Sequence, residues 1–161
     1  MLKIRGANAR DRAAIWSLLE PVIRADETYA LPVEMKRPSA LAYWFGKHHD
    51  VFVAEDTSRI VGTYFIQPNQ KGGGSHVANC GYITASHATG KGVARAMCAH
   101  SIEYARLRGF RAIQFNFVVS TNERAVKLWQ SLDFTIVGRL PEAFQHPDLG
   151  YVDALIMHRA I

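Results

Sequence analysis

Apolar residues recur at helical spacing in four segments of the chain. In the first, from Ala9 to about Ala25, the spacing places them on one side of a helix at Ile15, Leu18, Leu19 and Val22. The other predicted helices are Pro38–Lys47, Gly90–Leu107 and Asn122–Leu132. On the third helix, the expected inner face is Val93, Met97, His100, Tyr104 and Leu107.

Seven shorter apolar runs, bounded by turn residues, have the length and composition of strands. They are Leu2–Ala7, Val51–Ala54, Ile60–Gln67, His76–Thr84, Arg111–Val118, Phe134–Gly138 and Tyr151–His158. Turns are expected at Asp56–Ser58 and at the glycine-rich segment Lys71–Ser75. The order of elements predicts a mixed α/β fold, a single domain over residues 1–161 in which about four helices cover a sheet of about seven strands.

Composition leaves two interpretations of the charge. Of the 161 residues, 48% are hydrophobic, enough to bury a sizeable core without disulfides or metals. Nineteen Lys and Arg against fourteen Asp and Glu give a net charge of +5, which suits either nucleic acid or a phosphorylated cofactor. The basic residues are spread along the chain, and no helix-turn-helix or RNA-binding pattern appears. We therefore expect no nucleic-acid partner.

The same sequence predicts a cytoplasmic protein without a membrane partner. The charged start of the chain lacks the apolar core of a signal peptide, and no apolar run approaches the roughly 20 residues that cross a bilayer. Cys80 and Cys98 form no CxxC pair, and no cysteine or histidine spacing resembles a metal site. A reducing compartment and the absence of a bound metal are the simplest expectations.

The most informative segment runs from Tyr82 to Arg95, where a predicted strand enters a loop of small residues that opens into a helix. We call residues 85–92 the glycine loop. Glycines let backbone N–H groups approach a ligand, and the start of a helix offers unpaired N–H groups and a positive dipole to a phosphate. The segment matches neither the P-loop pattern nor the GxGxxG dinucleotide pattern, since Ala85 and Arg95 occupy required glycine positions. A tight turn without a ligand is the alternative.

Two motifs resemble those of the GNAT superfamily of N-acetyltransferases. Thr89–Ala94 is similar to the family's acetyl-CoA diphosphate loop, in which a Gln or Arg is followed by spaced small residues. Asn122–Trp129 with the following Leu132–Phe134 resembles the second motif, NxxAxxLY followed by GF, about thirty residues further on. The resemblance implies the GNAT fold, acetyl-CoA as cofactor and, often, a homodimer. It implies cofactor contacts from Tyr82, Ile83, Thr84, Thr89, Gly90, Lys91, Gly92, Val93, Ala94, Arg95, Asn122 and Trp129.

The motifs also depart from the family pattern. Thr89 replaces the usual Arg or Gln, so one side chain directed at the phosphates is missing. Trp129 replaces a frequent tyrosine that protonates the departing thiolate of coenzyme A, a role that an indole N–H cannot fill. What the resemblance implies is direct attack of an amine on the thioester, with a backbone N–H of the strand ending Tyr82–Thr84 holding the developing oxyanion.

The acceptor is expected to be a small amine. Asn79 and Asn116 lie inside apolar strands, where Asn is unfavourable unless its amide has a partner. With Asn122 they form a pattern similar to a GNAT subgroup that acetylates proline analogues, in which such asparagines bind the acceptor carboxylate and support the chemistry. We assign Asn116 and Asn122 as candidate catalytic residues. The candidate acceptor-binding residues are Glu27, Tyr29, Asn79 and Asn116.

Several alternatives remain open at this stage. Asn79 and Asn116 could instead satisfy backbone groups at a β-bulge. The protein could be an acyl-CoA sensor without catalysis, or a basic nucleic-acid-binding module. Within the enzyme hypothesis, an amino acid or an amino-acid-like toxin is the leading acceptor, in a pocket expected to be built from loops at Asp26–Val33 and Arg139–Gly150.

Overall fold

The computed structural model describes residues 1–161 and contains a seven-stranded sheet with four α-helices, the mixed α/β architecture that the sequence predicts. The strands are β1 (Leu2–Gly6), β2 (Asp50–Asp56), β3 (Arg59–Pro68), β4 (Val77–Thr84), β5 (Ala112–Val119), β6 (Thr135–His146) and β7 (Gly150–Ala160). The helices are α1 (Arg12–Ala25), α2 (Arg37–Trp44), α3 (Val93–Leu107) and α4 (Glu123–Ser131). The spatial order of the strands is β1-β2-β3-β4-β5-β7-β6.

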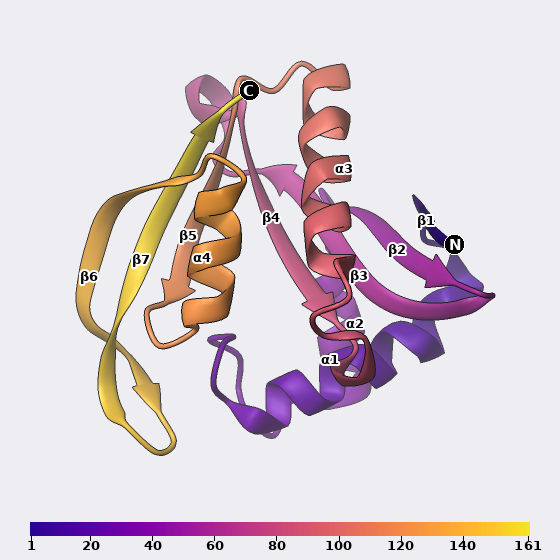
Figure 1. The fold of residues 1–161 in the computed structure, drawn as a ribbon, viewed down its shortest axis with the longest axis horizontal. Coiled ribbons are helices and arrows are strands. Elements are labelled where there is room, and N and C mark those ends of the chain that lie inside the picture. The colour runs from indigo at the N-terminus through magenta and orange to yellow at the C-terminus, as the bar shows by residue number, and fades with distance from the viewer.

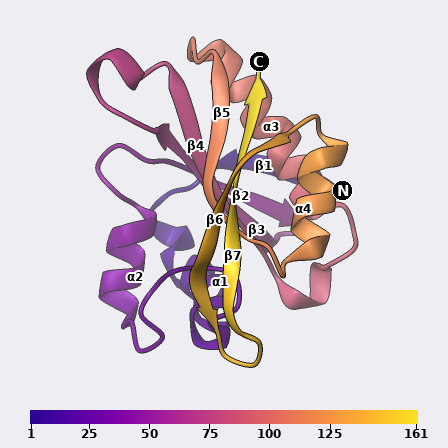
Figure 2. The same cartoon turned by 90° about the vertical axis from the view of Figure 1, so that its left-hand side faces the viewer.

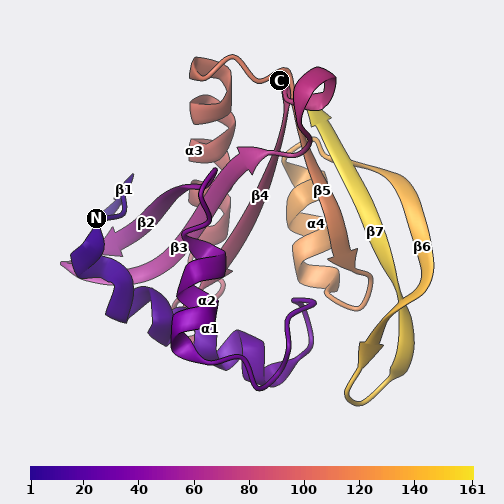
Figure 3. The ribbon, with the colours of Figure 1, turned by 180° about the vertical axis from the view of Figure 1, so that it is seen from behind.

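The helices cover both faces of the sheet. Figure 1 shows α3 and α4 in front of the strands, and Figure 3 shows α1 and α2 on the opposite face. Figure 2 shows the sheet between the two pairs of helices. A core of apolar side chains joins the layers, with Trp44, Tyr64, Met97 and Ile113 among the largest that are fully buried. None of the helices combines the length and the apolar character needed to span a bilayer.

All neighbouring strands are antiparallel except β4 and β5, which run parallel. That parallel pair is also short, because only Val77 with Ala112 and Ala78 with Ile113 are in register. Beyond these residues the two strands separate, as the view in Figure 1 shows. The sheet is thereby opened at its centre.

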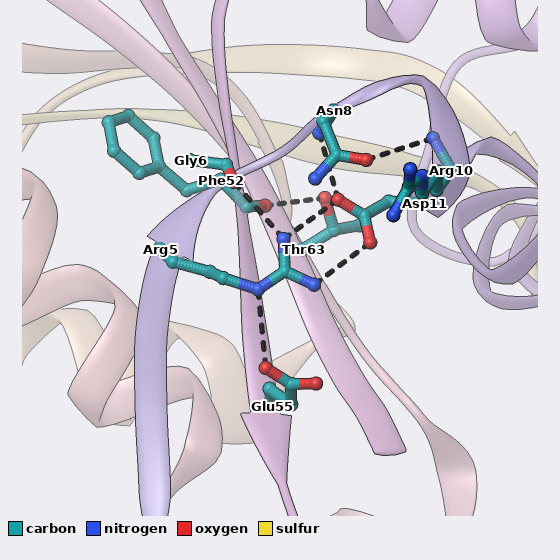
Figure 4. A network of polar contacts seen from close by, with 8 residues as sticks. All are labelled: Arg5, Gly6, Asn8, Arg10, Asp11, Phe52, Glu55 and Thr63. Carbon is teal, nitrogen blue, oxygen red and sulfur yellow. Dashed lines mark hydrogen bonds and ion pairs between the residues drawn. The ribbon is translucent and has the colours of Figure 1, made fainter. Parts of the chain in front are cut away.

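A polar network fastens the start of the chain to the sheet (Figure 4). The guanidinium of Arg5 donates two hydrogen bonds of 2.9 Å to the carboxylate of Asp11 and one of 3.2 Å to Glu55. The backbone N–H of Asn8 donates to the same Asp11 carboxylate, which closes a capping box before α1. Asp11 is buried, and these bonds stabilise its charged form.

The structure corrects three details of the predicted elements. Helix α3 begins at Val93 rather than at Gly90, because Gly92 adopts a left-handed conformation and caps the helix. Leu107 is 86% exposed instead of buried. It follows Ala105, the last buried residue of the helix, by two positions, which turns it about 200° away from the core.

The third correction concerns the segment Arg139–Gly150, which was expected to be a loop. Strand β6 runs on to His146, and β7 begins at Gly150. The two form a long hairpin whose register shifts twice, between Ile136 and Gly138 and between Leu140 and Phe144. The outer residues of β6 are mostly exposed, so its apolar pattern is weak and pairing with β7 decides its conformation.

Candidate active site

Asn79 marks the point at which β4 and β5 separate. Its side-chain N–H donates to the backbone carbonyl of Gln114 on β5 at 3.0 Å. That carbonyl faces β4, where a continued parallel ladder would have supplied a backbone partner. The amide of Asn79 takes the place of that partner, so the strands can diverge without leaving a polar group unpaired.

The hydrogen-bond alternation along β4 directs three residues toward the gap. Ala85 N–H donates to the Val61 carbonyl at 2.8 Å, and Asn69 N–H donates to the Val77 carbonyl at 2.7 Å. In an antiparallel pair, every second residue bonds to the same neighbour. The backbone groups of Cys80, Tyr82 and Thr84 therefore point away from β3, toward the side that β5 has left.

A cleft of about 820 Å³ occupies this gap. Its walls come from β3, β4 and β5, from the glycine loop and the start of α3, from α4, and from α1, α2 and the segment between them. Most of the predicted site residues line it, namely Tyr29, Asn79, Tyr82, Ile83, Thr84, Thr89, Gly90, Gly92, Val93, Ala94, Arg95, Asn116, Asn122 and Trp129. Lys91 and Glu27 are exposed and do not line the cleft.

The glycine loop brings unpaired backbone donors to one end of the cleft. Gly90 and Gly92 have φ angles of 80° and 81°, a conformation that favours glycine. The first helical hydrogen bond of α3 runs from Ala96 N–H to the Gly92 carbonyl at 3.0 Å, and no side chain caps the helix. The N–H groups of residues 93–95 thus precede the first helical bond and are free to bind an anion.

Two arginines line the cleft, and they are its only charged side chains. Arg95 comes from the first turn of α3 and donates to the Ser131 hydroxyl of α4 at 2.9 Å. Arg124 comes from the first turn of α4 and is exposed. The helix start and both guanidiniums give the cleft the electrostatic character of a phosphate site, which an acyl-CoA would fit.

Trp129 forms part of an aromatic wall on the α4 side. Its ring centroid lies 5.1 Å from that of Tyr82 and 5.2 Å from that of Phe115. Only 8% of Trp129 is exposed. The hydroxyl of Tyr82 lies 2.7 Å from that of Ser101 on α3, and it is therefore hydrogen-bonded outside the cleft.

Tyr29, Tyr43 and Phe65 line the part of the cleft beside α2, which we call the aromatic end. Phe117 also lines the cleft, and its ring lies 6.2 Å from that of Phe144 on β6. Phe65 packs edge-on against Trp44 at 4.8 Å and Tyr43 at 6.1 Å. These aromatic residues were not assigned from the sequence, except Tyr29, because an aromatic side chain in a strand usually indicates core packing.

Asn116 lies in a β-bulge of β5 that is visible as a register shift between Phe115 and Val118. Its amide is held on both sides, since its Nδ2 donates to Asn69 Oδ1 at 2.6 Å and its Oδ1 accepts from Gln114 Nε2 at 2.9 Å. Asn116 therefore contacts other side chains, whereas Asn79 satisfies a backbone carbonyl. Sequence reasoning missed Asn69 and Gln114, because nothing in the order of residues brings the end of β3 to β5.

The two thiols are poor nucleophiles. Cys80 lines the cleft and Cys98 is buried on α3, and neither forms a disulfide. Burial raises the pKa of Cys80 to about 12 and that of Cys98 to about 11. Both thiols are thus protonated at neutral pH, and a thiolate is the reactive form.

Comparison with known proteins identifies the family. The family model of the Acetyltransferase (GNAT) family matches residues 15–134. The chain is 28% identical over 174 residues to N-acetyltransferase aca1 of Schizosaccharomyces pombe, covering 94% of this chain and 83% of that protein. A GCN5-related N-acetyltransferase from Kribbella flavida is 43% identical with a TM-score of 0.95, covering 99% of this chain and 98% of that one.

A more distant solved structure shares the fold. A phosphinothricin acetyltransferase from Sinorhizobium meliloti, in complex with acetyl-CoA, is 16% identical with a TM-score of 0.86, covering 99% of this chain and 88% of that one. The family match agrees with the enzyme class and the cofactor that the sequence motifs imply, and the two more similar relatives agree with the enzyme class. The chain belongs to the GNAT family and is an N-acetyltransferase that uses acetyl-CoA.

Proposed function

We propose that this protein transfers an acetyl group directly from acetyl-CoA to the amino group of a small molecule, with an amino acid or a proline analogue as the leading acceptor. The observation that carries the proposal is a single cleft lined by the open edge of β4, by the free N–H groups at the start of α3 and by the side chains of Asn79 and Asn116. Such a cleft accommodates both reactants at once.

The backbone supplies the groups for the cofactor. Bound acetyl-CoA provides an acetyl group activated as a thioester. The N–H groups of residues 93–95 would hold its diphosphate, with Arg95 and Arg124 adding charge. The N–H of Tyr82, which faces the cleft, is the donor for the oxygen that gains negative charge during the reaction, a contribution of roughly 3–4 kcal/mol in other enzymes.

The acceptor would bind at the aromatic end. Rings of Tyr29, Tyr43 and Phe65 suit the apolar body of a small amine, and the cleft places no carboxylate there that would favour a second cationic group. Asn116 offers an amide N–H to the acceptor's carboxylate, held in place by Asn69. We propose that Asn116 and Asn122 support the chemistry and that the acceptor contacts Asn79 and Tyr29.

Direct transfer is supported by the state of the thiols. Cys80 is the thiol in the cleft, and its raised pKa keeps it protonated. Its side chain is therefore unsuited to forming an acyl-enzyme at neutral pH.

A coupled assay tests this function. Wild-type protein is incubated with acetyl-CoA and cyclic amino acids with four-, five- and six-membered rings, and release of free thiol and the acetylated product are measured. We expect thiol release only with both reactants present. Asn116→Ala should lower kcat/KM for these acceptors by at least tenfold, because one contact to the carboxylate is lost. Wild-type kcat/KM in that variant would refute the role of Asn116.

A non-catalytic acyl-CoA sensor is the second candidate, and Trp129 in place of the usual proton-donating tyrosine favours it. Acetyl-CoA at 100 times its dissociation constant should raise the melting temperature by about 5–10 °C for either candidate. Thiol release across the amine panel distinguishes them. Thermal stabilisation without any turnover would support the sensor.

We also propose a homodimer in the cytoplasm, in which the whole chain acts as one acetyltransferase domain. Strand β6 lies at the edge of the sheet and carries exposed apolar residues, Ile136 at 41% and Val137 at 60%. Such an edge favours pairing with a second copy. Light scattering after size-exclusion chromatography should give twice the chain mass for the wild type and the monomer mass for Val137→Lys. The two unpaired cysteines favour a reducing compartment.

A further inference from the structure

Tyr29 reaches the reacting edge of β4 from outside the sheet. It lies in the segment between α1 and α2, and its hydroxyl donates to the backbone carbonyl of Tyr82 at 3.2 Å. Its ring packs edge-on against Trp44 with a centroid distance of 6.3 Å. The carbonyl and the N–H of Tyr82 point to the same side of the strand. The Tyr29 hydroxyl is therefore beside the N–H that the proposed function uses.

Gly81 makes this approach possible. A Cβ atom at position 81 would lie 2.9 Å from the Tyr29 hydroxyl oxygen and 2.6 Å from Phe65 Cε1. Both distances are shorter than real Cβ contacts allow. The missing side chain at position 81 thus lets the phenol and the Phe65 ring close on β4 together, at the aromatic end of the cleft.

The Tyr29 hydroxyl can then act toward a ligand in the cleft only as a hydrogen-bond acceptor. A hydroxyl has a single proton and two lone pairs, and the proton of Tyr29 is donated to Tyr82. Burial raises its pKa far above the ordinary value, so the group stays a neutral phenol. Toward the cleft it offers only an acceptor, which matches an N–H group and does not match an ether or carbonyl oxygen.

We propose that the Tyr29 hydroxyl oxygen accepts a hydrogen bond from the N–H of the acceptor amine and so directs the amine lone pair at the acetyl group. Two hydrogen bonds then lie in series. The amine N–H donates to the Tyr29 oxygen, and the Tyr29 O–H donates to the Tyr82 carbonyl. Tyr29 orients the amine and keeps its own proton. As the new C–N bond forms and the C–S bond breaks, the amine proton leaves with the sulfur, and coenzyme A departs as the free thiol. This inference rests on the proposed function, and it assigns to Tyr29 the discrimination between nitrogen and oxygen in the acceptor.

The test compares two ligands that differ at one ring position, and each ligand is compared between the variant and the wild type so that the difference in charge between the ligands cancels. L-Proline has a ring nitrogen that bears hydrogen, and tetrahydrofuran-2-carboxylate has a ring oxygen in its place. The dissociation constant of each is measured by calorimetry on enzyme saturated with coenzyme A. In Tyr29→Phe we expect proline to bind about tenfold more weakly, the effect of one lost hydrogen bond, and the oxygen analogue to bind within twofold of wild type.

Tyr104→Phe is the matched control. Its hydroxyl donates to Asp50 at 2.7 Å outside the cleft, so the substitution also removes one hydrogen-bonded phenol oxygen. Both ligands and acetyl-CoA should bind to it as to the wild type. Acetyl-CoA should also bind normally to Tyr29→Phe, whereas kcat/KM with the best acceptor of the panel should fall by at least tenfold.

The outcomes separate the two proposals. Equal weakening of both ligands in Tyr29→Phe would show that the phenol only holds the α1–α2 segment, and unchanged binding and kcat/KM would show that it is not used. Either result overturns the inference while leaving the acetyltransferase intact. If wild-type protein acetylates no amine, the proposed function fails, and the assignment of Tyr29 fails with it.

Discussion

Asn79 on β4 and Gln114 on β5 are joined by a single hydrogen bond, from the Asn79 side-chain amide to the Gln114 carbonyl, at the place where the two strands separate. The bond gives the Gln114 carbonyl a partner at the point where the cleft begins. A side chain can end a strand pair in this way and leave no backbone carbonyl without a hydrogen-bond partner. Asn79 lines the cleft, and its side chain also allows the separation of β4 and β5 that forms the cleft.

Asn79→Ala should destabilise the fold at this point. The Gln114 carbonyl would lose its partner beside the strand junction, and we expect the free energy of unfolding to fall by about 1–2 kcal/mol. Urea denaturation measures the change. Gln114→Ala is the control, because it keeps the carbonyl and loses only the exposed side-chain bond to Asn116. Equal stability of the two variants would contradict the structural role of Asn79.

Gly92→Ala should impair both stability and cofactor binding. At a φ of 81° an alanine is strained, so the free energy of unfolding should fall by about 1 kcal/mol. The strain would also shift the start of α3, and acetyl-CoA should bind at least tenfold more weakly by calorimetry. Gly109→Ala, with a φ of 83° at the other end of α3, should lose similar stability but keep cofactor affinity. Weakened binding in both variants would argue against a specific role for the loop.

Arg124→Gln should weaken acetyl-CoA binding through charge. An exposed guanidinium that contacts a phosphate contributes about 1 kcal/mol, so the dissociation constant should rise about fivefold at low ionic strength. The difference should shrink in 0.5 M salt, where the Debye length falls to roughly 4 Å. Arg59→Gln, which removes the same charge at the start of β3 and outside the cleft lining, serves as control. A salt-independent defect would point to lost packing instead.

The Arg5–Asp11 pair predicts how stability depends on pH. Hydrogen bonds from Arg5 hold the pKa of the Asp11 carboxyl below its usual value, against the opposing effect of burial. The stabilisation is therefore present above the unfolded-state pKa of about 3.9 and is lost as pH falls through the lower folded-state pKa.

Asp11→Asn isolates that contribution. It should cost about 1–3 kcal/mol at pH 7, because Arg5 and the Asn8 N–H lose a charged acceptor. The difference in the free energy of unfolding between the variant and the wild type, measured by urea denaturation, should become smaller below pH 4. Asp148→Asn, on the exposed β6–β7 turn, is the control and should show little change at either pH. If that difference is the same at pH 7 and at pH 3, the charged Asp11 carboxylate is not the source of the stabilisation.

The part of the cleft around the glycine loop is largely predictable from the sequence, because its residues are close together along the chain. The glycine loop, the start of α3 and the first turn of α4 are short segments whose backbone donors follow from glycine positions and helix starts. The same logic predicts that Lys91 contacts the cofactor, yet Lys91 is exposed and does not line the cleft, whereas Gly90 and Gly92 on either side of it do.

The part of the cleft that we propose for the acceptor is less predictable from the sequence, because its residues meet only through contacts between distant segments of the chain. Asn69 and Asn116 are 47 positions apart, and Tyr29 and Tyr82 are 53 apart. Asn79 was singled out for an acceptor role, with a backbone partner as the alternative. The bond to Gln114 supports that alternative, and the cleft lining leaves the acceptor role open. The long β6–β7 hairpin escaped prediction because exposed strand residues carry little hydrophobic signal.

The sequence by itself determined the order of helices and strands, the fold class and the position of the glycine loop before α3, because periodic burial and glycine conformations are encoded over a few adjacent residues. The tertiary structure alone decided where β4 leaves β5, which amide fills the junction and which phenol reaches the exposed strand edge. Those features depend on side chains from separate elements satisfying one another's polar groups, and a hydrogen-bond partner 35 or 53 residues away leaves no periodic pattern in the chain.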